Sequence, residues 1–191
     1  DVFSGAPTLV ALAALRTGVD LTYIAAPHKT AYAISSMSPN LITIKLEGDY
    51  LNPRNVAIIK RYLNVSTAVV MGPGLGLHTE TKEAVREIVQ PIEEAKIPFL
   101  LDADGLKAFA EFKRKVSSPL VLTPHAGEYQ ILTGRALPKD LKERAEEVKK
   151  TSEQLGAVIL LKGHVDVISN GKRVKLNFTG NPGMTVGGTG D

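Results

Sequence analysis

Short apolar segments rich in β-branched residues alternate along this chain with segments that have helical periodicity. Two examples lie at 65–71 and 97–101, where the composition is that expected for a strand covered on both faces. Such strands are typical of parallel sheets between layers of helices. The alternation therefore predicts an α/β protein with a mainly parallel sheet.

The same patterns place the individual elements. Strands are expected at 21–25, 41–45, 65–71, 97–101, 119–122, 157–161, 165–169 and 173–178. Helices are expected at 6–16, 27–36, 53–63, 78–95, 126–132 and 140–155, with Pro91 interrupting the fourth of them. The last two strands flank Asn170-Gly171, a strong hairpin signal, so we expect the sheet to end in an antiparallel edge.

Composition limits the class of protein. The 191 residues have the size of one domain, and no linker or repeat divides them. The absence of cysteine excludes disulfides, a thiolate nucleophile and cysteine-bound metals. With 5% aromatic residues, no tryptophan and a net charge of +3, we expect no nucleic-acid partner. No segment is apolar enough to span a membrane or to act as a signal peptide, so we expect a cytoplasmic protein without a membrane partner.

The two ends of the chain carry an expectation of their own. The chain starts at Asp1 without an initiator methionine. It stops directly after a glycine cluster, where a functional loop normally leads into another element. We therefore expect residues 1–191 to form a single domain and to be a fragment that is truncated at both ends.

Ligands of parallel α/β sheets bind beyond the carboxyl ends of the strands, so the residues that follow each strand are candidates for a site. Gly72, Gly74 and Gly76 follow the strand expected at 65–71, and their backbone N–H groups could reach phosphate or carboxamide oxygens. A tight turn without a ligand explains the pattern equally well. Leu77 stands where the dinucleotide-binding fingerprint needs a glycine, and no Walker loop is present.

Polar residues follow the next two strands as well. Asp102 and Asp104 could bind a hydrated divalent cation, although capping of the following helix is the simpler role for Asp104. His125 and Glu128 lie three residues apart near the start of the helix expected at 126–132. A single histidine is more often structural than functional, but a preceding proline fixes this one at a strand end.

The last motif combines the groups that phosphoryl transfer needs. Residues 187–191 read Gly-Gly-Thr-Gly-Asp, in which backbone N–H groups can hold the migrating charge and Asp191 can accept a hydroxyl proton. A purely structural glycine turn would not need the aspartate. Lys162 and Gly163 follow the strand expected at 157–161 and add a cation suited to phosphate.

Taken together, the motifs resemble those of the ADP- or ATP-dependent NAD(P)H-hydrate dehydratases, which belong to the ribokinase-like superfamily. The resemblance covers essentially the whole chain and is carried by Ser-Gly-Ala-Pro at 4–7, Gly-Pro-Gly-Leu-Gly at 72–76, Asp-Ala-Asp-Gly-Leu at 102–106, Thr-Pro-His-Ala-Gly-Glu at 123–128, Lys-Gly at 162–163 and Asn-Pro-Gly-Met-Thr-Val-Gly-Gly-Thr-Gly-Asp at 181–191. It implies a ribokinase-like three-layer α/β/α sandwich. It also implies a lyase that phosphorylates the C6 hydroxyl of hydrated NADH or NADPH with ADP or ATP and then eliminates phosphate.

The resemblance implies a role for each motif. Asp191 would be the catalytic base, and Gly188, Thr189 and Gly190 would form the anion hole for the transferred phosphoryl group. The implied substrate-binding residues are Ala6, Gly74, Gly76, His125 and Asp191. The implied nucleotide-binding residues are Lys162, Gly163, His164, Val165, Asp166 and Gly190. Glu128 and Asp102 would hold Mg²⁺ through water molecules.

Asp166 departs from the family pattern, because many members have a threonine there and a carboxylate would repel phosphate. We expect it to face the base or the ribose instead. The resemblance also implies a homo-tetramer and, in many microbes, fusion to an NAD(P)H-hydrate epimerase domain.

Two other functions stay open on the same scaffold. One is a small-molecule kinase of the hydroxyethylthiazole or hydroxymethylpyrimidine type, and the other is a nucleotide-binding domain without catalysis. The motif at 4–7 and His125 favour the dehydratase, because a plain kinase needs no pocket for a dinucleotide.

Overall fold

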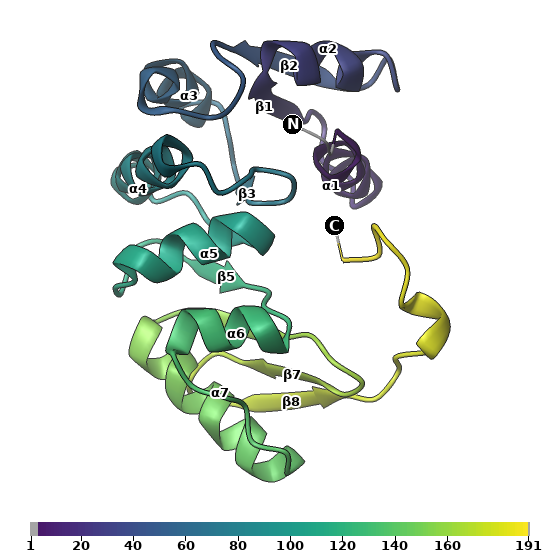
Figure 1. The fold of residues 1–191 in the computed structure, drawn as a ribbon, viewed down its shortest axis with the longest axis vertical. Coiled ribbons are helices and arrows are strands. Elements are labelled where there is room, and N and C mark those ends of the chain that lie inside the picture. Colours follow the sequence, from purple (N-terminus) through teal and green to yellow (C-terminus); the bar gives the residue numbers. More distant parts are fainter. Residues whose placement is uncertain (1–3, 191) are drawn as a thin grey trace.

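Parallel strands alternate with helices through most of the computed structural model, which describes residues 4–190 (Figure 1). Six strands form a sheet in the order β3-β4-β5-β6-β7-β8, in which β3 to β6 are parallel and the last two are antiparallel to their neighbours. These strands are β3 (Val69–Met71), β4 (Phe99–Leu101), β5 (Leu120–Leu122), β6 (Val158–Leu161), β7 (Asp166–Ser169) and β8 (Val174–Asn177). The expected hairpin and antiparallel edge are confirmed.

Helices connect the strands in the predicted alternation, which confirms the fold class. They are α1 (Gly5–Arg16), α2 (His28–Ser35), α3 (Val56–Leu63), α4 (Thr79–Glu94), α5 (Ala103–Phe112), α6 (Ala126–Thr133) and α7 (Leu141–Leu155). The short 3₁₀ helices are η1 (Pro53–Asn55) and η2 (Pro182–Met184). Over residues 4–190, no helix has both the length and the apolar character that crossing a membrane requires.

Strand β3 is shorter than the apolar segment that predicted it. The segment begins at residue 65, but the N–H groups of Val65 and Ser66 donate to Tyr62 and Leu63 at the end of α3. These residues therefore close a turn, and regular pairing begins only at Val69. The apolar pattern identified the strand but not the residue at which the turn after α3 ends.

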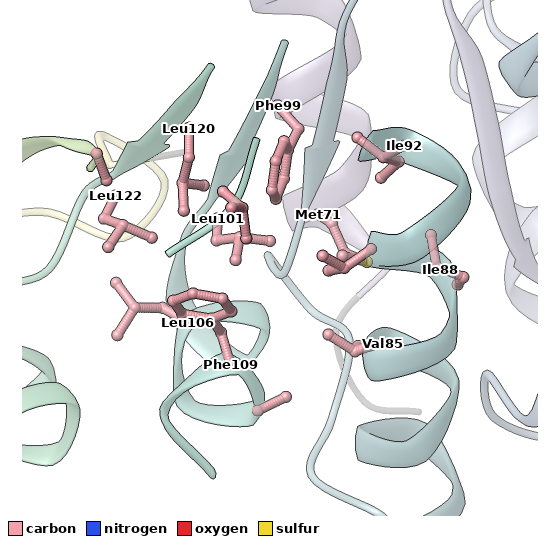
Figure 2. Packing of buried hydrophobic residues seen from close by; sticks show 14 of the residues in the cluster. Met71, Val85, Ile88, Ile92, Phe99, Leu101, Leu106, Phe109, Leu120 and Leu122 are labelled. Carbon is pink, nitrogen blue, oxygen red and sulfur yellow. The ribbon is translucent and has the colours of Figure 1, made fainter. Parts of the chain in front are cut away.

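The expectation that Pro91 interrupts a helix is wrong. Helix α4 continues through Pro91 as far as Glu94. A proline inside a helix loses one backbone hydrogen bond, at a cost of about 3 kcal/mol. Here Pro91 is buried on the same helix as Ile88 and Ile92, whose packing against the sheet is shown in Figure 2. Burial of that apolar face holds the helix together across the missing bond.

The first two strands form a smaller, separate sheet. β1 (Tyr23–Pro27) and β2 (Ile42–Leu46) pair in parallel, and a cavity of about 770 Å³ lies between β1 and β3. Both strands line this cavity over their full length, together with residues of α1 and α3. Among the described residues, β1 consequently pairs only with β2, and β3 only with β4. Sequence periodicity identifies strands without saying which of them pair, so this division was not foreseen.

The main core holds the middle of the six-stranded sheet in place. Figure 2 shows side chains of β4 and β5 packed beside those of α4 and α5. Leu101, Leu106, Phe109 and Leu122 are completely buried there. Burial of each such side chain stabilises the fold by about 1.5–3 kcal/mol, so the carboxyl ends of β4 and β5 are held firmly by the core. The loops that follow β4 and β5 extend from these strand ends.

Candidate active site

Four loops meet at the carboxyl edge of the parallel strands. Backbone hydrogen bonds continue beyond the strands and join each loop to the next: Asp102 donates to Met71 O (3.3 Å), Thr123 to Leu101 O (3.3 Å), and Lys162 to Pro124 O (2.8 Å). The loops after β3, β4, β5 and β6 therefore form one row. The structure brings the motifs after these four strands to the same edge of the sheet.

The glycine loop after β3 is a turn that leaves the N–H of Gly74 without an acceptor in the described chain. Leu75 N–H donates to Gly72 O (3.0 Å), and Gly74 has a φ of +69°, as a type II turn requires. Gly76 N–H donates to Asp104 Oδ2 (3.0 Å). Within residues 4–190, the N–H of Gly74 donates to no protein acceptor. Of the two glycines expected to bind substrate, Gly74 thus keeps its N–H available to a ligand.

Gly72 meets a packing requirement instead. Its φ is +137°, and an added Cβ would lie 1.8 Å from the backbone oxygen of Asp102. Gly105, which follows β4, has the same packing requirement, because an added Cβ would lie 2.4 Å from Met71 O at the end of β3. The backbones at the ends of β3 and β4 can approach this closely only if both residues lack side chains. In the glycine loop, Gly72 therefore allows close packing of the two strand ends, while Gly74 exposes a backbone N–H.

Asp102 and Lys162 form an ion pair across the row of loops. Lys162 Nζ lies 2.9 Å from Asp102 Oδ1, and the Asp102 side chain is only 7% exposed. A carboxylate so well shielded from water requires a partner of opposite charge. Asp102 also occupies the N-cap position of α5. Asp104 lies inside the first turn of this helix, and its side chain accepts a hydrogen bond from Gly76 N–H. The expectation that Asp104 caps this helix is therefore wrong.

His125 and Glu128 form a reciprocal cap at the start of α6. Nδ1 of His125 accepts hydrogen bonds from the N–H groups of Gly127 (3.0 Å) and Glu128 (3.3 Å). Glu128 Oε2 accepts one from His125 N–H (3.0 Å). This hydrogen-bond pattern assigns the proton of the neutral imidazole to Nε2. The His125 side chain is 59% exposed, so a structurally fixed ring also presents an N–H donor at the edge.

The two carboxylates expected to hold Mg²⁺ are each partly engaged. One oxygen of Asp102 accepts from Lys162, and one oxygen of Glu128 accepts from a backbone N–H. No three acidic or histidine side chains in the described part of the chain gather closely enough to bind a metal by themselves. The other oxygen of Glu128 lies 3.4 Å from His125 Nε2, and the other oxygen of Asp102 accepts no hydrogen bond within residues 4–190. Two carboxylate oxygens of this kind fit Mg²⁺ held through water and phosphate oxygens, as this ion is commonly bound.

Asp166 closes its own loop. Its Oδ1 accepts from Gly163 N–H (3.0 Å) and its Oδ2 from Asn177 Nδ2 (3.0 Å). Both carboxylate oxygens therefore have partners, one in the loop between β6 and β7 and the other at the end of β8. This arrangement explains how an aspartate is accommodated at a position where a nucleotide is expected to bind.

A second cavity, of about 330 Å³, lies between α6 and the segment after β6. Lys162, Gly163 and Val165 line it, while His164 lies exposed at the tip of the same segment. Lys139 and Arg144 line it from the other side. Sequence analysis missed these last two residues, because nothing distinguishes them from the other charges of a solvated helix.

The C-terminal glycine loop reaches the same region from a distant part of the chain. Figure 1 shows the segment after β8 running along one side of the molecule toward α1. A Cβ added at Gly190 would lie 3.8 Å from Lys162 Nζ. Thr189 Oγ1 donates to Met184 O (2.7 Å) or Val186 O (2.8 Å), which folds the loop back on itself. Asp191, the expected base, lies outside the described residues.

The loop presents several backbone donors. In the described chain, the N–H groups of Gly187, Gly188 and Gly190 donate to no protein acceptor. Adjacent unpaired N–H groups form a concave site for an anion. The start of α1 lies across the larger cavity from the other glycine loop, because Pro7 and Gly74 both line that cavity. Ala6 precedes Pro7 in the first turn of α1.

Comparisons with known proteins agree with this arrangement. A sequence profile described as NAD(P)H-hydrate dehydratase matches residues 1–191. The bifunctional NAD(P)H-hydrate repair enzyme of Pyrobaculum aerophilum is 51% identical over 189 residues, which make up 99% of this chain and 37% of that protein. The chain thus spans less than half the length of this relative.

Two solved structures resemble the chain. The ADP/ATP-dependent NAD(P)H-hydrate dehydratase of Bacillus subtilis, co-crystallised with ATP and Mg²⁺, is 30% identical with a TM-score of 0.75, and the match covers 98% of this chain and 64% of that one. A ribokinase-like superfamily protein of Enterococcus faecalis is 24% identical with a TM-score of 0.79, covering 97% and 62%, which shows that the fold is ribokinase-like. Because the profile matches from end to end, the chain belongs to the NAD(P)H-hydrate dehydratase family.

Proposed function

We propose that this chain carries out the ADP- or ATP-dependent dehydration of hydrated NADH and NADPH. The observation that carries the proposal is that the C-terminal glycine loop and Lys162 meet at one edge of the sheet. In the C-terminal loop, the N–H groups of Gly187, Gly188 and Gly190 have no acceptor among residues 4–190, and Gly190 lies beside the ammonium group of Lys162. Preorganised donors of this kind stabilise a phosphoryl group during transfer.

The C-terminal loop and Asp191 would perform the first step. Asp191 takes the proton of the C6 hydroxyl, and the hydroxyl oxygen attacks the terminal phosphorus of the nucleotide. The shortened nucleotide leaves, while the N–H groups of Gly188 and Gly190, on either side of Thr189, hold the charge of the transferred group. The N–H of Thr189 itself donates to Val186 O (3.4 Å), so Thr189 would shape this anion hole. The ring nitrogen then supplies an electron pair that expels phosphate from C6, and loss of a proton from C5 restores the dihydronicotinamide.

The hydrated dinucleotide would lie between α1 and the loops after β3 and β5. Gly74 offers its free N–H, and His125 offers Nε2–H from a ring held by its own helix cap. Both donors suit a carboxamide or phosphate oxygen. Pro7 lines the same space from α1, and Ala6 precedes it in the first turn of that helix, where a small residue would let the ligand approach the backbone.

The adenine nucleotide would occupy the smaller cavity beside α6. Its volume of about 330 Å³ is at the lower end of the range for ligand pockets. Lys162, Lys139 and Arg144 give it a positive lining that favours phosphate. Mg²⁺, held through water by Asp102 and Glu128, would neutralise charge on the phosphates. The B. subtilis relative, which was co-crystallised with ATP and Mg²⁺, supports this part of the proposal.

We propose three further properties for the whole protein. It acts in the cytoplasm as a homo-tetramer, and an NAD(P)H-hydrate epimerase domain is part of the same polypeptide. The bifunctional repair enzyme of P. aerophilum supports the last point. Exposed apolar side chains on and beside α1 and α2, at Leu9, Tyr32 and Met37, support an oligomer interface. Light scattering of the complete protein tests the tetramer.

A single assay tests the activity. The complete protein is incubated with hydrated NADH, Mg²⁺ and either ADP or ATP, and near-ultraviolet absorbance is followed. Recovery of the absorbance only with nucleotide supports the dehydratase. Phosphorylation of a thiazole or pyrimidine alcohol without recovery supports the kinase instead, and nucleotide binding without turnover supports a non-catalytic domain. Asp191→Ala should nearly abolish turnover while nucleotide binding stays, and an undiminished rate would exclude Asp191 as the base.

A further inference from the structure

Asp104 joins the glycine loop after β3 to helix α5. Its Oδ2 accepts a hydrogen bond from Gly76 N–H at 3.0 Å, and its Oδ1 lies 2.9 Å from Lys107 Nζ. The side chains of Asp104 and Lys107 are only 22% and 29% exposed. A hydrogen bond to an ionised acceptor is about twice as strong as a neutral one. Asp104 thus holds the far end of the glycine loop.

Ala103 directs two neighbouring carboxylates to different loops. Its φ is +47°, a left-handed conformation that few residues with a side chain adopt. On one side of it, Asp102 pairs with Lys162 after β6, and on the other, Asp104 accepts from Gly76 after β3. One short segment after β4 therefore contacts both the glycine loop and the lysine that borders the smaller cavity.

The bond to Asp104 also determines which donor the glycine loop offers. The N–H of Leu75 is used within the turn, and the N–H of Gly76 is used by Asp104. The N–H of Gly74, which precedes both of these residues, donates to no acceptor in the described residues. If the bond to Asp104 were lost, only the turn would order the loop. A ligand would then have to order the loop itself, which weakens binding.

We propose that Asp104 is a positioning residue for dinucleotide binding. It touches no reacting atom and acts through Gly76, whose fixed position aims the N–H of Gly74 at the ligand. The inference rests on the proposed function, which assigns the glycine loop to the hydrated dinucleotide. Loss of the carboxylate should weaken dinucleotide binding about ten-fold, as expected for one charge-assisted hydrogen bond, without changing nucleotide binding.

Three variants of the complete protein test the proposal. Asp104→Ala removes the acceptor, Asp104→Asn keeps an oxygen that can accept from Gly76, and Lys107→Met removes only the ion pair. Calorimetry measures the Kd for NADPH and for ATP, and turnover of hydrated NADPH gives KM and kcat. Hydrogen exchange of residues 72–77 without ligand reports directly on the order of the loop. Urea unfolding shows which variants are fully folded at the assay temperature.

In Asp104→Ala, the backbone amides of residues 72–77 should exchange faster. The Kd and KM for the dinucleotide should rise about ten-fold with kcat unchanged, because the lost interaction binds the substrate and the transition state equally. Asp104→Asn should restore most of the affinity, and Lys107→Met should behave like the wild type. An unchanged Kd in Asp104→Ala, or an equal loss in Lys107→Met, would overturn the proposal. If the wild type binds NADPH but repairs no hydrated NADPH, the proposed function fails while the Kd comparison still decides the role of Asp104. A wild type that does not bind NADPH would overturn both.

Discussion

Replacing Gly72 with alanine should destabilise the protein far more than the same change at a glycine where an added Cβ has free space. Gly72 has a φ of +137°, and its new Cβ would lie 1.8 Å from the backbone oxygen of Asp102. Because that atom belongs to the backbone, no side-chain rotation relieves the overlap. Strain at the residue costs about 1–3 kcal/mol, and the forced shift of two packed strand ends costs about as much again. We expect a total loss of about 3 kcal/mol or more.

Gly134→Ala is the matched control. Gly134 also has a positive φ, of +76°, but an added Cβ meets nothing within 4 Å. Only the conformational cost of about 1 kcal/mol applies there. For a domain of this size, each kcal/mol lowers Tm by about 2–4 °C. Calorimetry should therefore find a fall of about 2–4 °C for Gly134→Ala and about 6–12 °C for Gly72→Ala. Equal shifts in the two variants would refute the close approach of the β3 and β4 ends.

Two further predictions concern charged groups. The hydrogen bond from Arg114 lowers the pKa of Glu93, so its ionised form stabilises the fold above the pKa of the unfolded chain, and this contribution is lost as the pH falls below about 4. Glu93→Gln should consequently be less stable than the wild type in urea at neutral pH and approach it in acid; a constant difference would contradict this. Lys162→Met leaves the buried carboxylate of Asp102 unpaired and should cost about 1–3 kcal/mol in unfolding, most of which Asp102→Asn should restore in the double variant.

Much of the architecture could be predicted because it depends on local patterns. Short apolar segments identified strands wherever two covered faces exclude polar side chains, and Asn170-Gly171 identified the hairpin through its turn chemistry. The motifs after β3 to β6 could be placed at one edge because parallel strands share their direction. His125 was correctly placed at a helix start, and the cap, which uses Nδ1, leaves the proton of the neutral ring on Nε2.

The contacts that complete the site could not be predicted, because they join residues far apart in sequence. The bond between Asp104 and Gly76 spans 28 positions, and the pair of Lys162 with Asp102 spans 60. The direction of the two aspartates depends on the left-handed φ of Ala103, for which alanine gives no signal. The role of Asp191 stays a prediction, since the residue lies outside the described part of the chain.

The path of one oxygen atom tests the central claim, that the substrate hydroxyl is phosphorylated before it leaves. Hydrated NADH carrying a heavy oxygen isotope at the C6 hydroxyl is incubated with the complete protein, Mg²⁺ and ATP. The inorganic phosphate released is then examined by phosphorus NMR. The account predicts one heavy oxygen in each phosphate formed during repair. Unlabelled phosphate, with the isotope found in water, would contradict it.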